Sequence, residues 1–241
     1  MSIEIMSPVG SYESLMAAIQ AGAGSVYFGV GKMNMRSRSA ANFDYDDLQQ
    51  LTQICKEHQV RSYLTVNTIV YNDEVEEMKK LVDLAKKCEV SAIIASDWAV
   101  IQYCRKIGME VHISTQCNIT NIEAVRFYAQ FADVLVLARE VSLAQAADIC
   151  QTIREENICG PSGQLIQIEM FVHGASVWQC LASATSALTT WAIPPTVGHA
   201  CNYAAANTPS KTQNLTWNWK WMANISCRQK TCAPSVFWTK S

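Results

Sequence analysis

Residues 61–97 read RSYLTVNTIVYNDEVEEMKKLVDLAKKCEVSAIIASD. The opening run is short, apolar and rich in β-branched residues, as expected of a strand that is buried on both faces. Residues 75–88 then repeat apolar side chains at helical spacing, and Asp73 with Glu76 resembles a capping box at the start of that helix. A second apolar run, Ala92–Ala95, follows. This stretch therefore predicts a strand, a helix and a further strand in succession.

The same alternation runs through the first 175 residues. Further strands are expected at Ile3–Met6, Ser25–Gly29, Glu110–Ser114, Val134–Leu137 and Gln167–Val172. Ser11 and Ser142 are placed to cap helices at their starts, and Gly108 is placed to end one. Repeats of about 22 to 30 residues, each a strand followed by a helix, predict a parallel sheet with right-handed crossovers.

Two α/β architectures fit this pattern, an open doubly wound sheet and a TIM-like (β/α) barrel. No Gly-x-Gly-x-x-Gly motif follows the first strand and the sequence holds no Walker motif, which disfavours a nucleotide-binding open sheet. Small or polar residues instead follow each strand, and a (β/α)₈ barrel presents its site in that way. We therefore expect an incomplete TIM-like barrel of about seven strands over residues 1–175.

Composition and charge exclude several classes of protein. The net charge of −2 gives no overall attraction to nucleic acid, and no apolar run reaches the ~18 residues of a membrane helix. The ten cysteines are scattered without a Cys-x-x-Cys pair, and the first residues do not resemble an export signal. A reduced, cytoplasmic protein without a membrane partner is the expectation.

The composition changes after residue 175. All 21 Asp and Glu residues lie at or before Glu169, whereas residues 176–241 hold six of the seven Trp. Trp has a single codon, and shifting the codons of residues 216–224 by one base gives an alternating strand followed by an Asp-Gly turn. We interpret residues 176–241 as a frame-shifted tail that is disordered and does not pack against the barrel, and the coding DNA tests this interpretation.

Six segments carry motif-like sequences in order along the first part of the chain. They are Glu4–Gly10, Ala21–Gly29, Val66–Asn67, His112–Asn118, Ala138–Glu140 and Glu169–Ala175. Together they resemble the collagenase-like peptidase family, numbered U-thirty-two. The resemblance implies a TIM-like barrel. Some family members are labelled proteases, and others take part in hydroxylating nucleobases of transfer or ribosomal RNA, or the ubiquinone ring.

Within this family, modification of an RNA nucleobase is favoured over proteolysis. The sequence shows no Ser–His–Asp order, no His-Glu-x-x-His helix and no paired-Asp motif. Collagenase-like proteolysis is the first alternative, and a truncated product without function is the second, so enzymatic activity of the chain as written stays open. The resemblance implies RNA or a small anionic co-substrate as the partner, and the oligomeric state is open.

Several members of the family carry an iron–sulfur cluster, and this sequence departs from their pattern. The cysteine-bearing signature that the family has after the segment ending at Ala175 is absent here. The shifted frame would restore cysteine at Val177, Ala184, Ala200 and Ala204, and four thiolates are what a [4Fe–4S] cluster requires. We therefore expect no metal site or cofactor in the chain as written, and a cluster only in a frame-restored protein.

Four polar residues that follow strands are predicted to bind substrate at the barrel mouth. They are Asn67, Asp97, Gln116 and Arg139. The guanidinium of Arg139 suits a carboxylate or phosphate, unless it is salt-bridged within the barrel. The amides of Asn67 and Gln116 suit a nucleobase or another amide.

Two further residues are predicted to be catalytic. His173 is either a general acid or base, or a group that hydrogen-bonds a neighbouring strand. Glu169 shares its strand face with Phe171 and His173, and is either a catalytic carboxylate or the partner of a buried basic group. His112 is expected to be a satisfied interior histidine, and Cys117 is the thiol of the first 175 residues with a claim on the site.

Overall fold

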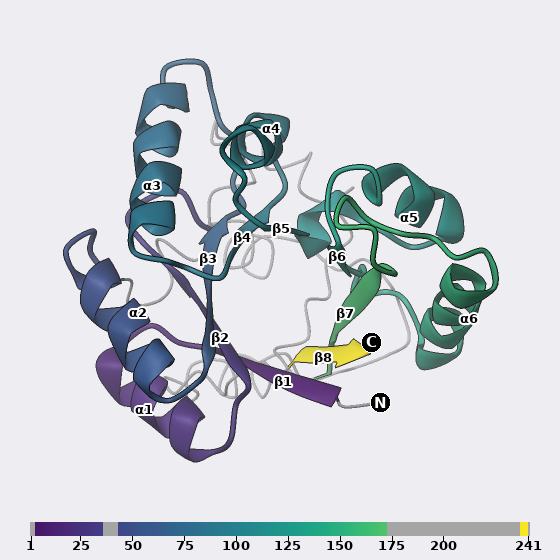
Figure 1. Ribbon diagram of the computed structural model, residues 1–241, viewed down its shortest axis with the longest axis horizontal. Coiled ribbons are helices and arrows are strands. Elements are labelled where there is room, and N and C mark those ends of the chain that lie inside the picture. Colours follow the sequence, from purple (N-terminus) through teal and green to yellow (C-terminus); the bar gives the residue numbers. More distant parts are fainter. Residues whose placement is uncertain (1–2, 36–42, 173–236, 241) are drawn as a thin grey trace, which may run out of the picture.

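The computed structural model describes residues 3–35, 43–172 and 237–240. In these ranges the strands form a ring and the helices lie outside it (Figure 1). The strands are β1 (Ile3–Pro8), β2 (Ser25–Gly29), β3 (Arg61–Val66), β4 (Ala92–Ala95), β5 (Val111–Ile113), β6 (Val134–Val136), β7 (Gln167–Phe171) and β8 (Phe237–Lys240). The helices are α1 (Tyr12–Gln20), α2 (Asp47–Glu57), α3 (Val75–Lys87), α4 (Trp98–Ile107), the 3-10 turn η1 (Thr115–Cys117), α5 (Ile122–Tyr128) and α6 (Leu143–Glu155).

The strands β1 to β7 pair in chain order, each parallel to the next, which confirms the seven predicted parallel strands. The expected gap beside β1 and β7 is not left open. β8 lies antiparallel between them, with Thr239 in register with both Glu4 and Glu169. The expectation that the whole tail stays apart from the barrel is therefore wrong for these four residues. Residues 173–236 lie outside the described part of the chain, and the division at residue 175 stays a prediction.

Local sequence determines where most helices begin and end. Ser11 and Ser142 close the capping boxes of α1 and α6, and Gly108 ends α4 in the left-handed conformation with φ 69°. The capping box predicted at Asp73 is wrong. The Tyr71 N–H donates to the Glu74 side chain in the preceding turn, so α3 begins at Val75 without a side-chain cap.

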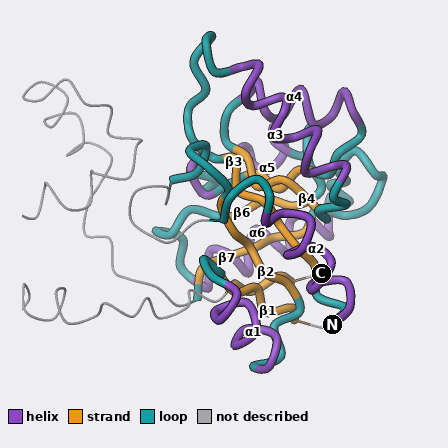
Figure 2. The backbone as a smooth tube through the Cα atoms, turned by 90° about the vertical axis from the view of Figure 1, so that its left-hand side faces the viewer, coloured by secondary structure: helices purple, strands orange, loops and turns teal. Residues whose placement is uncertain are grey.

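Two apolar layers follow from the alternation of side chains along the strands. The larger layer lies between the strands and the surrounding helices and includes Phe28, Leu64 and Ile93. The smaller layer fills the inside of the ring, with members Met6, Tyr27, Tyr63, Ala92, Ile94 and Val136. Figure 2 shows the strands in the middle and the helices around them. Among the described helices, none combines the length and the apolar character that crossing a membrane would require.

Candidate functional site

An ion pair lies inside the barrel, and its two residues are the only acidic or basic side chains that are buried in the described part of the chain. His112 on β5 and Glu169 on β7 are 2% and 1% exposed, and His112 Nδ1 lies 3.0 Å from Glu169 Oε1. The other ring nitrogen, Nε2, lies 3.3 Å from Oε1 of Glu110, which is half-exposed. Glu169 Oε2 is buried and has no hydrogen-bond partner in the part of the chain that the structure describes. His112 thus links the buried carboxyl group of Glu169 to the half-exposed carboxyl group of Glu110.

The pair sets the protonation state of the barrel interior. Burial by itself lowers the pKa of His112. The charge of Glu169, close to Nδ1, and the hydrogen bond between Nε2 and Glu110 outweigh burial and raise this pKa to about 9. The ring of Tyr63 lies 4.6 Å from the His112 ring, and burial raises the pKa of the Tyr63 phenol. At neutral pH the interior therefore holds a positively charged imidazolium at His112 and a neutral phenol at Tyr63.

At the carboxyl ends of the strands, hydrogen bonds tie neighbouring loops into a series that we call the rim. Its first half joins the loops after β2, β3, β4 and β5. The Met35 N–H donates to Asn67 Oδ1 at 3.2 Å, and the Ser96 hydroxyl donates to the Asn67 carbonyl at 3.0 Å. The Cys117 thiol donates to the Ser96 carbonyl with a sulfur–oxygen distance of 3.7 Å.

The second half of the rim joins the loop after β5 to the end of β6. The Thr115 hydroxyl donates to the Leu137 carbonyl at 3.1 Å, and the Ala138 N–H donates to the Ile119 carbonyl at 2.9 Å. Five consecutive loops are thereby held in fixed relation around the mouth of the barrel.

Two of the predicted substrate-binding residues hold the backbone in place. Asp97 caps α4 through Oδ1, which accepts the Ala99 N–H at 2.8 Å, and its Oδ2 accepts the Val70 N–H at 3.1 Å. The amide oxygen of Asn67 is likewise engaged by a main-chain N–H of the rim. Both residues therefore shape the mouth, and the two Asp97 carboxyl oxygens and the Asn67 amide oxygen already have protein partners.

The other two, Gln116 and Arg139, are exposed at the mouth. The Arg139 guanidinium lies 4.5 Å from the centre of the Phe171 ring, and no described acidic side chain pairs with it. Gln116 lies on η1, and its side-chain amide has no hydrogen bond to the described part of the chain. These two groups remain available to a ligand. His173, the remaining predicted residue, lies outside the described residues.

Sequence reasoning missed two members of the site. The ring of Phe171 lies against the Arg139 guanidinium. Its position two residues after Glu169, on the inward face of β7, is the sequence signal that could have placed it in the site. Glu110 reaches His112 in the same way, because it precedes that residue by two along the chain. In both cases strand periodicity gives the direction of the side chain but not the partner.

The described thiols and histidines give little support to nucleophilic or metal chemistry. Burial raises the pKa of Cys117, against a smaller lowering by the Tyr128 hydroxyl, so this thiol is a weak nucleophile. No described Ser or Cys is hydrogen-bonded to a histidine. Within residues 3–35, 43–172 and 237–240, no three His, Cys, Asp or Glu side chains are grouped to hold a metal, so these residues do not fit an iron–sulfur cluster. The candidate cluster positions lie outside the described ranges.

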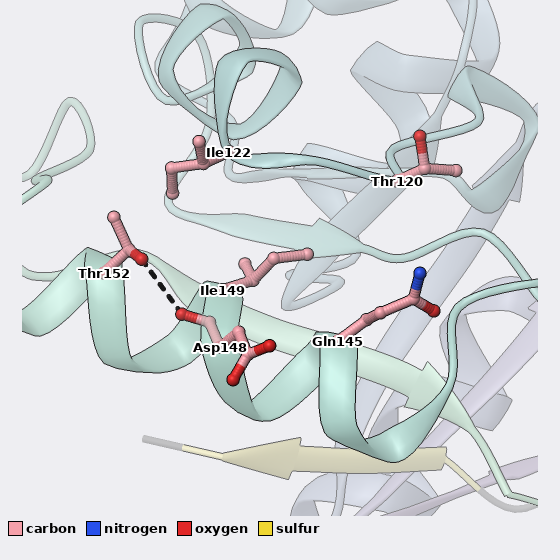
Figure 3. A pocket seen from close by; sticks show the side chains of 6 residues that line it. All are labelled: Thr120, Ile122, Gln145, Asp148, Ile149 and Thr152. Atoms are coloured by element: carbon pink, nitrogen blue, oxygen red, sulfur yellow. Dashed lines mark hydrogen bonds between the residues drawn. The ribbon is translucent and has the colours of Figure 1, made fainter.

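A hollow of about 240 Å³ lies on the outside of the barrel between α6 and the start of α5 (Figure 3). It is lined by Thr120, Ile122, Gln145, Asp148, Ile149 and Thr152. The Thr152 hydroxyl donates to the Asp148 carbonyl, and Gln145 belongs to the capping box of α6. The Thr152 hydroxyl and the Gln145 side chain thus serve α6 itself.

Comparison with known proteins identifies relatives of the chain. The family model described as Peptidase family U32 matches residues 10–189. A Porphyromonas gingivalis protein named collagenase is 58% identical over 71% of this chain and 42% of its own length. A Bacillus subtilis tRNA hydroxylation protein P1 is 29% identical over 74% of this chain and 40% of its own length. The Escherichia coli 23S rRNA 5-hydroxycytidine C2501 synthase is 29% identical over 72% of this chain and 24% of its own length.

A solved structure of the U32 peptidase Mk0906 matches with a TM-score of 0.52 and 11% identity, over 61% of this chain and 63% of that one. This likeness supports the fold. The chain spans about two-fifths of the first two of these curated relatives, and about a quarter of the third.

Proposed function

The chain belongs to peptidase family U32, and we propose that its barrel mouth binds an RNA nucleotide whose base is hydroxylated by the complete protein. The observation that carries the proposal is the exposed Arg139 guanidinium. It is supported on the Phe171 ring and has no acidic partner among the described residues. A cation that lies over an aromatic ring and has no acidic partner is prepared to receive an anion.

The chemistry of the two free groups fits a nucleotide. An arginine fork pairs with phosphate oxygens in bidentate fashion, and its plane also stacks on an unstacked base. The Gln116 amide offers both donors and acceptors to a base edge. The rim fixes the loops that carry both residues, so the spacing between the anion-binding group and the base-reading group is set before binding. A small anionic co-substrate is the other ligand that Arg139 would accept.

Collagenase-like proteolysis is the second candidate function, and the name of the 58% identical relative favours it. Serine, cysteine and metal-dependent peptidases need an activated side-chain nucleophile or a metal-bound water. The described part of the chain supplies neither, because Cys117 has a raised pKa and no described hydroxyl or thiol is bonded to a histidine. RNA modification is therefore better supported by these residues. The cytoplasm, where such RNA resides, is the compartment that we propose.

Two matched variants test the nucleotide site. Arg139→Ala removes the proposed anion-binding group. Arg154→Ala is the control, because it removes an equal charge from an exposed position in the last turn of α6. Binding of fluorescein-labelled tRNA and of a short oligouridine is measured by anisotropy at two salt concentrations. We expect Arg139→Ala to weaken binding about tenfold and to reduce the salt dependence, and Arg154→Ala to leave both unchanged.

An activity assay accompanies the binding assay. The chain, its Arg139→Ala variant and a frame-restored version are expressed in a host that lacks its tRNA hydroxylation protein, and hydroxylated nucleosides are quantified by mass spectrometry. Gelatin cleavage is measured in parallel. Equal RNA binding by wild type and Arg139→Ala, or gelatin cleavage without any RNA binding, would overturn the proposed site.

A further inference from the structure

Four aromatic side chains lie together on the outside of the barrel. One is on α4, two are on α5, and the fourth lies three residues after the end of α5. We call this cluster the aromatic face, and its members are Trp98, Phe127, Tyr128 and Phe131. The Trp98 ring lies 4.8 Å from the Phe131 ring and 5.9 Å from the Phe127 ring, in edge-to-face contacts. Trp98 and Phe127 nevertheless remain 39% and 47% exposed. Rings that pack on one another and still present this much surface to water are typical of a contact site.

The charges on the α4 side of the aromatic face are positive. The Arg105 guanidinium lies 5.4 Å from the centre of the Phe131 ring, and Lys106 follows it on α4, which carries no acidic residue. Arg126 on α5 is neutralised by Glu123 and Glu156. The cations that remain unpaired therefore lie on the α4 side of the face, on a chain whose formal net charge is −2.

The aromatic face begins at the barrel mouth. Trp98 directly follows Asp97, which caps α4 at the carboxyl end of β4. Tyr128 stacks on Trp98 with an angle of 15° between the rings, and its hydroxyl interacts with the Cys117 thiol. Cys117 belongs to η1, which also carries Gln116. A ligand that reaches Gln116 would therefore meet Trp98 as it leaves the mouth.

We propose that the aromatic face binds single-stranded RNA flanking the nucleotide at the mouth, with bases stacked on Trp98 and Phe127 and phosphates held by Arg105 and Lys106. The inference rests on the proposed function and deepens it. Aromatic side chains interleaved with unpaired cations form a stacking platform for single strands, whereas the core of a protein interface is depleted of charge. The positive α4 side favours the polyanion.

The experiment uses the full chain and two RNA probes. A labelled oligouridine of about twelve nucleotides is long enough to cover both the mouth and the face, and a trinucleotide covers the mouth alone. The double variant Trp98→Ala with Phe127→Ala should bind the long RNA about tenfold to a hundredfold more weakly and the trinucleotide as tightly as wild type. The control Leu143→Ala removes an exposed apolar side chain from α6 and should change neither affinity.

The outcomes separate this inference from the proposed function. If wild type binds neither RNA, the proposed function fails and this inference with it. If wild type binds both and the double variant matches it on the long RNA, the aromatic face is not an RNA site, although the mouth still is. If the double variant binds both RNAs like wild type but has a different oligomeric mass by light scattering without RNA, the aromatic face is a protein interface and the inference is overturned. Trp98→Phe, which keeps a ring and guards against misfolding, should retain most of the affinity.

Discussion

The His112–Glu169 pair makes the stability of the barrel depend on pH in a direction that the structure fixes. His112 has a pKa of about 9 in the folded protein, against an ordinary value of 6.5. A raised folded pKa gives stability that is fully present below pH 6.5 and is lost as the pH rises through about 9. The difference between the two values corresponds to about 3 kcal/mol in the free energy of unfolding.

Glu169→Gln isolates this contribution, because the amide keeps the shape of the side chain and removes its charge. Glu110 then remains as the acidic partner of His112, and it is half-exposed. We expect the variant to be about 3 kcal/mol less stable than wild type near pH 6, in the range found when one partner of a buried pair is removed. The difference should shrink toward about pH 9.5, where the imidazole of the wild type is neutral as well.

Urea unfolding followed by circular dichroism at several pH values measures both effects. His58→Gln is the matched control, because His58 is exposed after α2 and has no ion pair with a described residue. It should leave the pH dependence unchanged. A Glu169→Gln variant that is as stable as wild type near pH 6, or that keeps the full pH dependence, would refute the assigned pairing.

Three further predictions concern the scaffold of the mouth and a buried thiol. Asp97→Ala should lower the free energy of unfolding by about 1 to 2 kcal/mol in urea titrations, because it removes the α4 cap and leaves the Val70 N–H without its acceptor. Gly29→Ala should lower the melting temperature, because an added Cβ would lie 2.4 Å from the Asn34 side chain, which is buried; an unchanged melting temperature would contradict the close approach of these two residues. Cys104, whose pKa burial raises to about 12, should resist iodoacetamide near pH 8 in the native protein and react after unfolding; rapid native labelling seen by mass spectrometry would contradict its burial.

The repeating part of the fold could be predicted because its determinants are local. Ser142 meets Gln145 three residues later, and Gly108 ends α4 through its own backbone freedom. Strand β3 is buried on both faces beyond Arg61, since one face meets the helices and the other meets the ring interior. The same local reasoning failed at Asp73, where Glu74 competes for the preceding turn.

The site was less accessible to sequence reasoning, since its contacts are not local. The alternation of side chains along each strand predicts that His112 and Glu169 both point into the barrel. Their contact depends on the stagger of β5 against β7 with β6 between them, and no sequence spacing encodes it. A polar residue at the end of a strand can hydrogen-bond either a main-chain group or a ligand. The residue type of Asp97 therefore could not show that it binds main-chain N–H groups.

The closing strand β8 was beyond prediction for another reason. It contributes to the ring through main-chain pairing with β1 and β7. These partners lie far from β8 along the chain, and a local side-chain pattern predicts a strand but not its neighbours in the sheet.

The residues that hold the rim together differ from the residues that are available to contact a ligand. Each of its ties uses at least one main-chain atom, and the side chains that take part are short, such as those of Ser96 and Thr115. The long side chains of Gln116 and Arg139 take no part in it. Substitutions at these two positions can therefore change which molecule is recognised without loosening the loops that present them. A scaffold divided in this way is suited to divergence, since one barrel can acquire new substrates by exchanging a few projecting side chains.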